Sequence, residues 1–302
     1  ARGGRDRGAV VGASALASVA MISQVAGTLG VLGTTVGAVG VLAPGWAVLL
    51  AWLWKRRAAR VRIAAPSWAA WVGVVPLAVL VSAAGAPPGW LWESEYAGFD
   101  ALSYHLTLPQ EWLAAGRITG LEHNVYSFLP GSYEAGVYHL AAMTGAPAGP
   151  VGVMERAGQG GEGGGFGLLA GDGWRLPAAQ FLHASMAVLA AWLVGRAGRA
   201  AAMLGASAGE DDERAARAAG RLSTLLTMAT AWCVVVGSLA YNEMGMVALG
   251  AGAMVVALDG AMAPWRRGLL AGLLVGAACG FKPTAMTFFT PKVVVAWRAT
   301  SS

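Results

Sequence analysis

The stretch AVVGASALASVAMISQVAGTLGVLGTTVGAVGVLAPGWAVLLAWLW, residues 9–54, contains no charged side chain. A helix needs about 20 apolar residues to cross the hydrocarbon core of a bilayer, so this run is long enough for two such helices with a turn between them. The whole chain is 56% hydrophobic and 12% charged, whereas soluble domains contain about 25% charged residues. The sequence therefore predicts an integral membrane protein.

Further apolar runs extend this interpretation along the chain. They predict an all-α fold, a polytopic transmembrane helix bundle of about seven spans, each crossing about 30 Å of hydrocarbon. The chain has no initiator methionine, and its last apolar segment runs almost to Ser302, so we expect a fragment of a longer protein. The expected spans are residues 9–27, 32–54, 66–86, 177–195, 222–240, 245–262 and 268–289.

The basic side chains gather in short clusters beside these runs, which is the positive-inside pattern of membrane proteins. This pattern explains the net charge of +5 without a nucleic-acid partner. It predicts a multi-pass protein of the plasma or inner membrane with these clusters on the cytoplasmic side. They are Arg2, Arg5 and Arg7; Lys55, Arg56, Arg57, Arg60 and Arg62; Arg196 and Arg199; and Arg266 and Arg267.

The predicted topology divides the chain into three regions. Residues 1–86 hold the N-terminal transmembrane helices, residues 87–176 form an extracytoplasmic loop, and residues 177–302 hold further transmembrane helices with a cytoplasmic loop at 196–221. The outer loop ends in a Gly-rich segment, residues 144–175, that we expect to be a flexible insertion. Its GQGGEG motif is not interpreted as a dinucleotide site, because no strand precedes it.

The segment FDALSYH, Phe99–His105, places an acid, a tyrosine and a histidine just past a membrane-length run. Asp100 is either a general base or cation ligand at the membrane boundary, or the N-cap of the helix that follows; the two roles are compatible. The loop beyond it is amphipathic, with Trp112 among its apolar residues. We expect one or two short helices on the membrane surface, interrupted at Pro109, that roof a cavity.

Two acids and a lysine elsewhere fall on the same outer side in this topology. Glu134 is either a first-turn helix acid or a functional group. Glu243 lies in a turn between apolar runs, where ionisable residues are costly and often functional, although an exposed turn residue is the alternative. Lys282 either snorkels to the interface or binds a phosphate.

The histidines leave metal dependence open. His105 and His139 are candidate ligands of a divalent metal, or are hydrogen-bonded residues at the membrane interface. No HxxxH or HExxH spacing supports a metal centre, so no metal ligand is predicted.

Several segments in order resemble a known family. The pattern D-A-x-x-Y-H-L, followed by EWLAAGRI and NVYSFLPGSYEAGVYHLA, resembles the first outer loop of GT-C membrane glycosyltransferases, nearest to bacterial relatives of protein mannosyltransferases and aminoarabinose transferases. SLAYNEMGMVALGAGAMVVAL and WRRGLLAGLLVGAACGFKPTAM are similar to that family's acid-bearing outer turn and lysine-bearing helix. The resemblance covers about residues 90–290; the Gly-rich insertion and the missing later spans depart from it.

The resemblance implies a sugar transferase that inverts the anomeric centre. Its donor would be a polyprenyl-phosphate-linked sugar in the lipid bilayer, and its acceptor a glycan, lipid or protein outside the cytoplasm. Asp100 would be the catalytic base and Glu243 the second acid of the catalytic centre, with Lys282 or Arg117 at the leaving phosphate. The expected substrate-binding residues are Tyr104, His105, Arg117, Glu134, Asn242 and Lys282.

Two other functions remain open at this point. A transporter or flippase would have charged residues near the middle of the membrane and broken helices in paired halves. A catalytically inactive membrane protein is the second alternative, because the family's later spans are missing.

Overall fold

The computed structural model describes residues 6–56, 68–88, 90–92, 98–143, 175–204, 206 and 209–300. Regular structure within these residues is helical, apart from an isolated bridge between Leu121 and Asn124. This confirms the all-α prediction. Most of the Gly-rich insertion, residues 144–174, and the basic positions at 57–62 lie outside the described residues.

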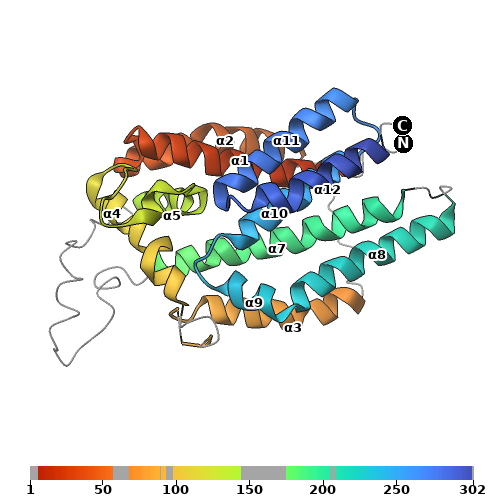
Figure 1. The fold of residues 1–302 in the computed structure, drawn as a ribbon, viewed down its shortest axis with the longest axis horizontal. Helices are drawn as coiled ribbons and strands as arrows, with labels where there is room; N and C mark the ends of the chain where they lie inside the picture. The colour runs from red at the N-terminus through yellow and green to blue at the C-terminus, as the bar shows by residue number, and fades with distance from the viewer. Residues whose placement is uncertain are drawn as a thin grey trace.

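The helices run roughly along one axis of the molecule, and the short α4 and α5 lie together near one end (Figure 1). Short helical turns η2 (Val31–Gly33), η4 (Ala101–His105) and η5 (Val125–Phe128) connect some of them. The α-helices are α1 (Arg7–Thr28), α2 (Thr35–Arg56), α3 (Trp68–Ala84), α4 (Thr107–Ala115), α5 (Ser132–Met143), α7 (Arg175–Ala202), α8 (Glu210–Ala229), α9 (Ala231–Ser238), α10 (Glu243–Ala257), α11 (Pro264–Phe281) and α12 (Ala285–Ala299).

Fewer helices than expected are long enough to cross a membrane. Among the described residues two qualify, α1 and the Leu176–Ala202 part of α7. The pair α8 and α9 makes a third candidate, although its axis bends by 60° where the two helices meet at Thr230. The prediction of about seven spans is therefore wrong for this part of the chain.

The apolar runs overestimated the spans because they continued across helix ends. Helix α10 has 15 residues, which rise about 22 Å, less than the hydrocarbon core of about 30 Å. The expected span 245–262 included the turn that follows this helix. Helix α3 has 17 residues, which rise about 26 Å, and is also shorter than a span.

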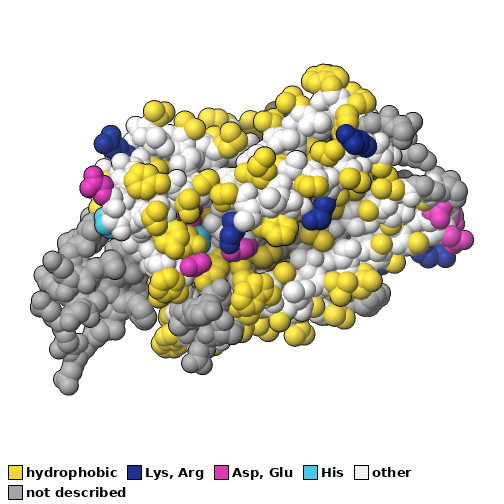
Figure 2. Space-filling model, in the orientation of Figure 1, with side chains coloured by type: hydrophobic (Ala, Val, Ile, Leu, Met, Phe, Trp, Pro, Cys, Tyr) yellow, Lys and Arg dark blue, Asp and Glu magenta, His cyan; other side chains and the backbone are white. Residues whose placement is uncertain are grey.

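The surface nevertheless fits a membrane protein. Large apolar side chains are exposed on α2 and α3, among them Val36 at 84%, Val75 at 67% and Trp71 at 66%. Hydrophobic side chains are spread widely over the face in Figure 2. Soluble monomers rarely expose large contiguous apolar patches, whereas lipid chains would cover such a surface.

The expected cytoplasmic loop at 196–221 is largely helical. Helix α7 continues to Ala202, and α8 begins with acidic residues in its first turn, where they complement the helix dipole. Glu213 of α8 accepts hydrogen bonds from Arg199 of α7 at 3.1 Å and from Arg217 at 2.7 Å. This segment therefore consists of the ends of two packed helices.

Glycines allow α7 and α8 to approach closely. A Cβ atom added to Gly220 would lie 2.8 Å from the carbonyl oxygen of Gly195 and 3.0 Å from the Cβ of Arg199. Small residues permit this kind of close backbone contact between helices in membranes. The α7–α8 contact therefore depends on the absence of a side chain at Gly220.

We predict that Gly220→Ala destabilises the protein by about 1–3 kcal/mol, because the added methyl group forces the two helices apart. Gly276→Ala on α11 is the matched control, since no described atom lies within 4 Å of the added Cβ, and it should leave stability unchanged or slightly raised. Thermal unfolding in nanodiscs measures both. Equal melting temperatures for Gly220→Ala and the wild type would contradict the close contact.

Candidate functional site

The FDALSYH segment contains a turn of π-helix, η4. The backbone N–H of Leu106 donates to the carbonyl oxygen of Ala101 at 3.0 Å, and the hydroxyl of Thr107 donates to that of Leu102 at 2.6 Å. Both bonds join residues five apart, the π-helical spacing. Single π-helical turns are rare and frequently occur at functional sites.

Asp100 directly precedes this turn, at the predicted N-cap position, but its side chain does not cap the helix. Its φ and ψ of −63° and −40° are helical, and its side chain makes no capping hydrogen bond, so the prediction of a capping carboxylate is wrong. The carboxylate instead accepts a hydrogen bond from the hydroxyl of Tyr104 at 3.2 Å. The π-helical turn holds Asp100 in helical geometry, and the tyrosine four residues later orients its oxygen.

The hydroxyl of Tyr104 lies within the electrostatic influence of three of the predicted acids. Its pKa is raised above the ordinary value, first by burial and then by the negative charges of Asp100, Glu134 and Glu243. The phenol therefore stays protonated and remains a hydrogen-bond donor at ordinary pH. Its ring also stacks on Tyr126, with centroids 4.2 Å apart and planes 14° apart.

His105 and Glu134 form a buried pair. The imidazole Nδ1 hydrogen-bonds Glu134 Oε1, and the two residues are 1% and 2% exposed. Glu134 lies in the first turn of α5, as expected from the sequence. Its Oε2 is buried and has no hydrogen-bond partner within the described part of the chain, so this oxygen remains able to accept one.

Glu243 and Lys282 form an ion pair between two helix ends. Glu243 begins α10, and Lys282 directly follows α11. Burial alone would raise the pKa of Glu243, but the hydrogen bond and the positive charge of Lys282 outweigh burial and bring this pKa below its ordinary value. The carboxylate is therefore ionised, and Lys282 is held by a partner as well as reaching toward solvent.

Asn242 fastens this pair to the fold. Its amide nitrogen donates to the carbonyl oxygen of Phe281 at 2.8 Å, which ties the turn before α10 to the end of α11. Figure 2 shows basic, acidic and histidine side chains gathered close together within a mainly apolar face. The acids and the lysine, far apart in sequence, lie near one another, because Asp100, Glu134 and Glu243 all act on Tyr104 and Glu243 pairs with Lys282.

Other predicted residues lie elsewhere. Arg117 is exposed beside Gly30 in the turn after α1, and no hydrogen bond or ion pair places it with the acids and Lys282 in the described structure. His139 is buried and hydrogen-bonds Ser23 and the carbonyl oxygen of Ala38, both at 2.8 Å. It is therefore a packing residue. The described residues contain no group of three or more His, Cys, Asp or Glu side chains arranged to hold a metal.

The outer loop packs differently from the expected surface helices. Helix α4 runs through Pro109 without interruption, because a proline in the first turn breaks no hydrogen bond of the helix. Leu108 and Trp112 are 1% and 2% exposed, so its apolar face packs against the protein. The helix ends at Gly116, whose φ of +71° favours glycine.

Sequence reasoning did not select three aromatic or imidazole residues beside the site. The ring centroids of Tyr133 and Tyr241 lie 5.6 and 5.4 Å from that of His105, and His183 lies 5.5 Å from Tyr133. In the sequence these residues stand out only as tyrosine or histidine side chains within apolar segments. Their contacts join segments that are far apart in sequence, so spacing along the chain does not reveal them.

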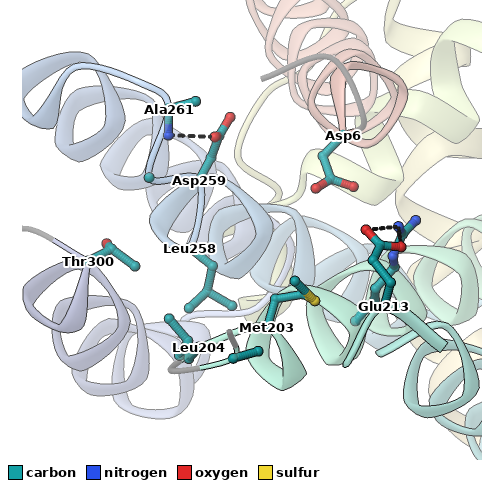
Figure 3. Close-up of a pocket in the computed structure, with 11 residues that line it drawn as sticks. Asp6, Met203, Leu204, Glu213, Leu258, Asp259, Ala261 and Thr300 are labelled. Atoms are coloured by element: carbon teal, nitrogen blue, oxygen red, sulfur yellow. Dashed lines mark hydrogen bonds and ion pairs between the residues drawn. The ribbon is translucent and has the colours of Figure 1, made fainter. Parts of the chain in front are cut away.

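A cavity of about 480 Å³ lies at the other end of α10. Figure 3 shows it between the ends of several helices, with Asp6, Glu213 and Asp259 around it. Glu213 already pairs with Arg199, and Asp259 accepts a hydrogen bond from the backbone of Ala261 at 3.0 Å. Glu213 and Asp259 therefore already have partners, and the cavity is separate from the site at Asp100.

Comparisons with protein-family models, with curated proteins and with solved structures find no match to this chain.

We predict that Lys282→Met raises the pKa of Glu243 above its ordinary value, because burial, the largest influence on this pKa, then outweighs the smaller lowering effects of His183 and the backbone. Infrared spectra recorded against pH measure the carboxyl group, with Glu243→Gln identifying its band. Lys292→Met is the control, since Lys292 caps the carbonyl oxygen of Phe288 on the exposed side of α12.

The shifted pKa of Glu243 makes the free energy of unfolding depend on pH. In the wild type the lowered pKa of Glu243 contributes stability above the ordinary glutamate pKa of about 4.3, and this contribution is lost as the pH falls through the folded value. In Lys282→Met the raised pKa contributes stability at low pH that is lost as the pH rises. An unchanged Glu243 titration in Lys282→Met would contradict the pairing.

Proposed function

We propose that this chain is a membrane glycosyltransferase that moves a sugar from a polyprenyl-phosphate donor to an extracytoplasmic acceptor hydroxyl. The observation that supports this most strongly is the convergence of Asp100, Tyr104 and the Glu243–Lys282 pair. Such a transfer requires a base for the acceptor proton and a cation for the leaving phosphate. The Asp100 carboxylate, held by Tyr104, and the Lys282 ammonium, held by Glu243, supply these two groups. The exposed apolar helices suit a donor whose tail lies in lipid.

The proposed reaction is a direct displacement. The acceptor oxygen bonds to the anomeric carbon and gives its proton to Asp100, while the bond from that carbon to the phosphate oxygen breaks and its electron pair leaves with the phosphate. Lys282 stabilises the charge that develops there, since an ammonium has three N–H donors and Glu243 occupies one. Attack opposite to the leaving group inverts the anomeric centre.

The remaining residues have supporting roles in this proposal. Tyr104 fixes the carboxylate of Asp100, and the buried His105, oriented by Glu134, packs against the ring of Tyr104 with centroids 4.0 Å apart. The site faces the extracytoplasmic side of the plasma or inner membrane, where a glycan, lipid or protein supplies the acceptor hydroxyl.

One observation favours a transporter instead. The 60° bend between α8 and α9 makes a broken helix, a feature of many transporter sites. However, the break at Thr230 lies apart in sequence from the paired charges, which occupy helix ends at Glu243 and Lys282. A transporter would move the lipid-linked sugar across vesicles without cleaving it, so product analysis separates the two functions.

We predict that Asp100→Asn lowers the rate of sugar transfer by about 10²–10⁴-fold, because an amide cannot accept the proton. Tyr104 can still donate to the amide oxygen, so the fold should persist. The assay supplies labelled polyprenyl-phosphate sugars to the full chain in nanodiscs.

Asp259→Asn is the control, because Asp259 lies beyond the far end of α10 and its carboxylate accepts a hydrogen bond from the backbone N–H of Ala261 in the adjacent turn. It should retain transfer. Wild-type protein that transfers no sugar from any donor, or an Asp100→Asn variant at full rate, would contradict the proposed mechanism.

A further inference from the structure

We infer that His183 is a positioning residue for Glu243, a role that rests on the proposed function. His183 lies in α7 and is 0% exposed. Its Nδ1 lies 2.8 Å from the carbonyl oxygen of Leu239, and its Nε2 lies 3.0 Å from the backbone nitrogen of Met244. Both nitrogens are therefore engaged by backbone groups that flank the acid-bearing turn.

These two contacts define the state of the ring. A carbonyl oxygen only accepts hydrogen bonds, so Nδ1 carries the proton that binds Leu239. The N–H of Met244 only donates, so Nε2 accepts with its lone pair. The imidazole is thus a neutral bridge, and a second proton would break the contact with Met244.

The bridge satisfies backbone groups that helices leave without partners. Leu239 is the residue after α9, and Met244 lies in the first turn of α10, where N–H groups have no acceptor within the helix. By bonding both, His183 fixes the separation of the two helix ends. Glu243 is the first residue of α10, directly before Met244.

A separate hydrogen bond positions the Lys282 side of the ion pair. Asn242 donates to the carbonyl oxygen of Phe281, the residue before Lys282. His183 therefore ties the segment around Glu243 to α7. Asn242, in the same segment, ties it to the residue before Lys282. Loss of the histidine would let Glu243 move relative to Lys282 while leaving both charges present.

Gln180 is a matched residue one turn earlier on the same helix. It is 1% exposed, and its amide donates to the carbonyl oxygens of Ala84 and Ala86, both at 2.7 Å. It is thus a buried polar clamp of the same kind, but it holds the end of α3 and not the acid-bearing turn. Substituting it controls for the general cost of losing a buried clamp.

The first test is kinetic. His183→Leu should lower kcat for sugar transfer about 10- to 100-fold with little change in KM, because small displacements of catalytic groups slow the chemical step. His183→Gln should recover much of the rate, since its amide oxygen can accept the hydrogen bond from Met244. Gln180→Leu should leave kcat near the wild-type value.

The second test does not depend on activity. Cysteines replace Glu243 and Lys282 in a chain whose Cys233 and Cys279 are alanine, and a short bis-methanethiosulfonate linker joins them. The cross-link should form more slowly when His183→Leu is added, and at an unchanged rate with Gln180→Leu.

Two results would overturn the inference: an unchanged cross-linking rate in His183→Leu, or equal losses of kcat in His183→Leu and Gln180→Leu. If the wild-type chain transfers no sugar, the proposed function fails, whereas slower cross-linking in His183→Leu would still show that the histidine positions the turn.

Discussion

The Glu243–Lys282 ion pair is the constraint on which the site depends. Loss of Lys282 would leave the largely buried carboxylate of Glu243 without its counter-charge, whereas Lys282 reaches solvent. This pair joins the first residue of α10 to the residue after α11, so it fixes the relative position of two helix ends. His183 and Asn242 then hold the same turn through backbone groups. The segment around Glu243 therefore carries the ion pair, the hydrogen bonds that fix it and the proposed chemistry.

The π-helical turn supplies the opposite side of the site. It places Asp100 and Tyr104 in hydrogen-bond contact and directs His105 toward Glu134. The aromatic rings of Tyr133 and Tyr241 lie beside His105 of this turn, with centroids 5.6 and 5.4 Å from that of the imidazole. In the proposed reaction, the Asp100 side accepts the proton and the Lys282 side receives the leaving phosphate. Tyr104 orients Asp100, and Glu243 orients Lys282.

The sequence predicted the class of the fold and part of the site. Uncharged runs identified the helices, and the alternation of basic clusters placed Glu243 and Lys282 at the same end, where they form a pair. The number of spans could not be read in this way, because hydropathy does not reveal that α10 stops at Ala257. The cap prediction for Asp100 failed since a π-helical turn leaves no local signal. His183 was missed because its partners are backbone atoms of a distant segment.

Photo-cross-linking tests the central claim most directly. A polyprenyl-phosphate sugar with a diazirine in its first isoprene unit would be irradiated with the full chain in nanodiscs, and the labelled peptides mapped by mass spectrometry. We expect labels within residues 241–246 and 281–286 that excess unmodified donor removes and that Lys282→Met weakens. Labels confined to the cavity at Leu258 and Asp259, or labels that excess donor does not remove, would contradict this account.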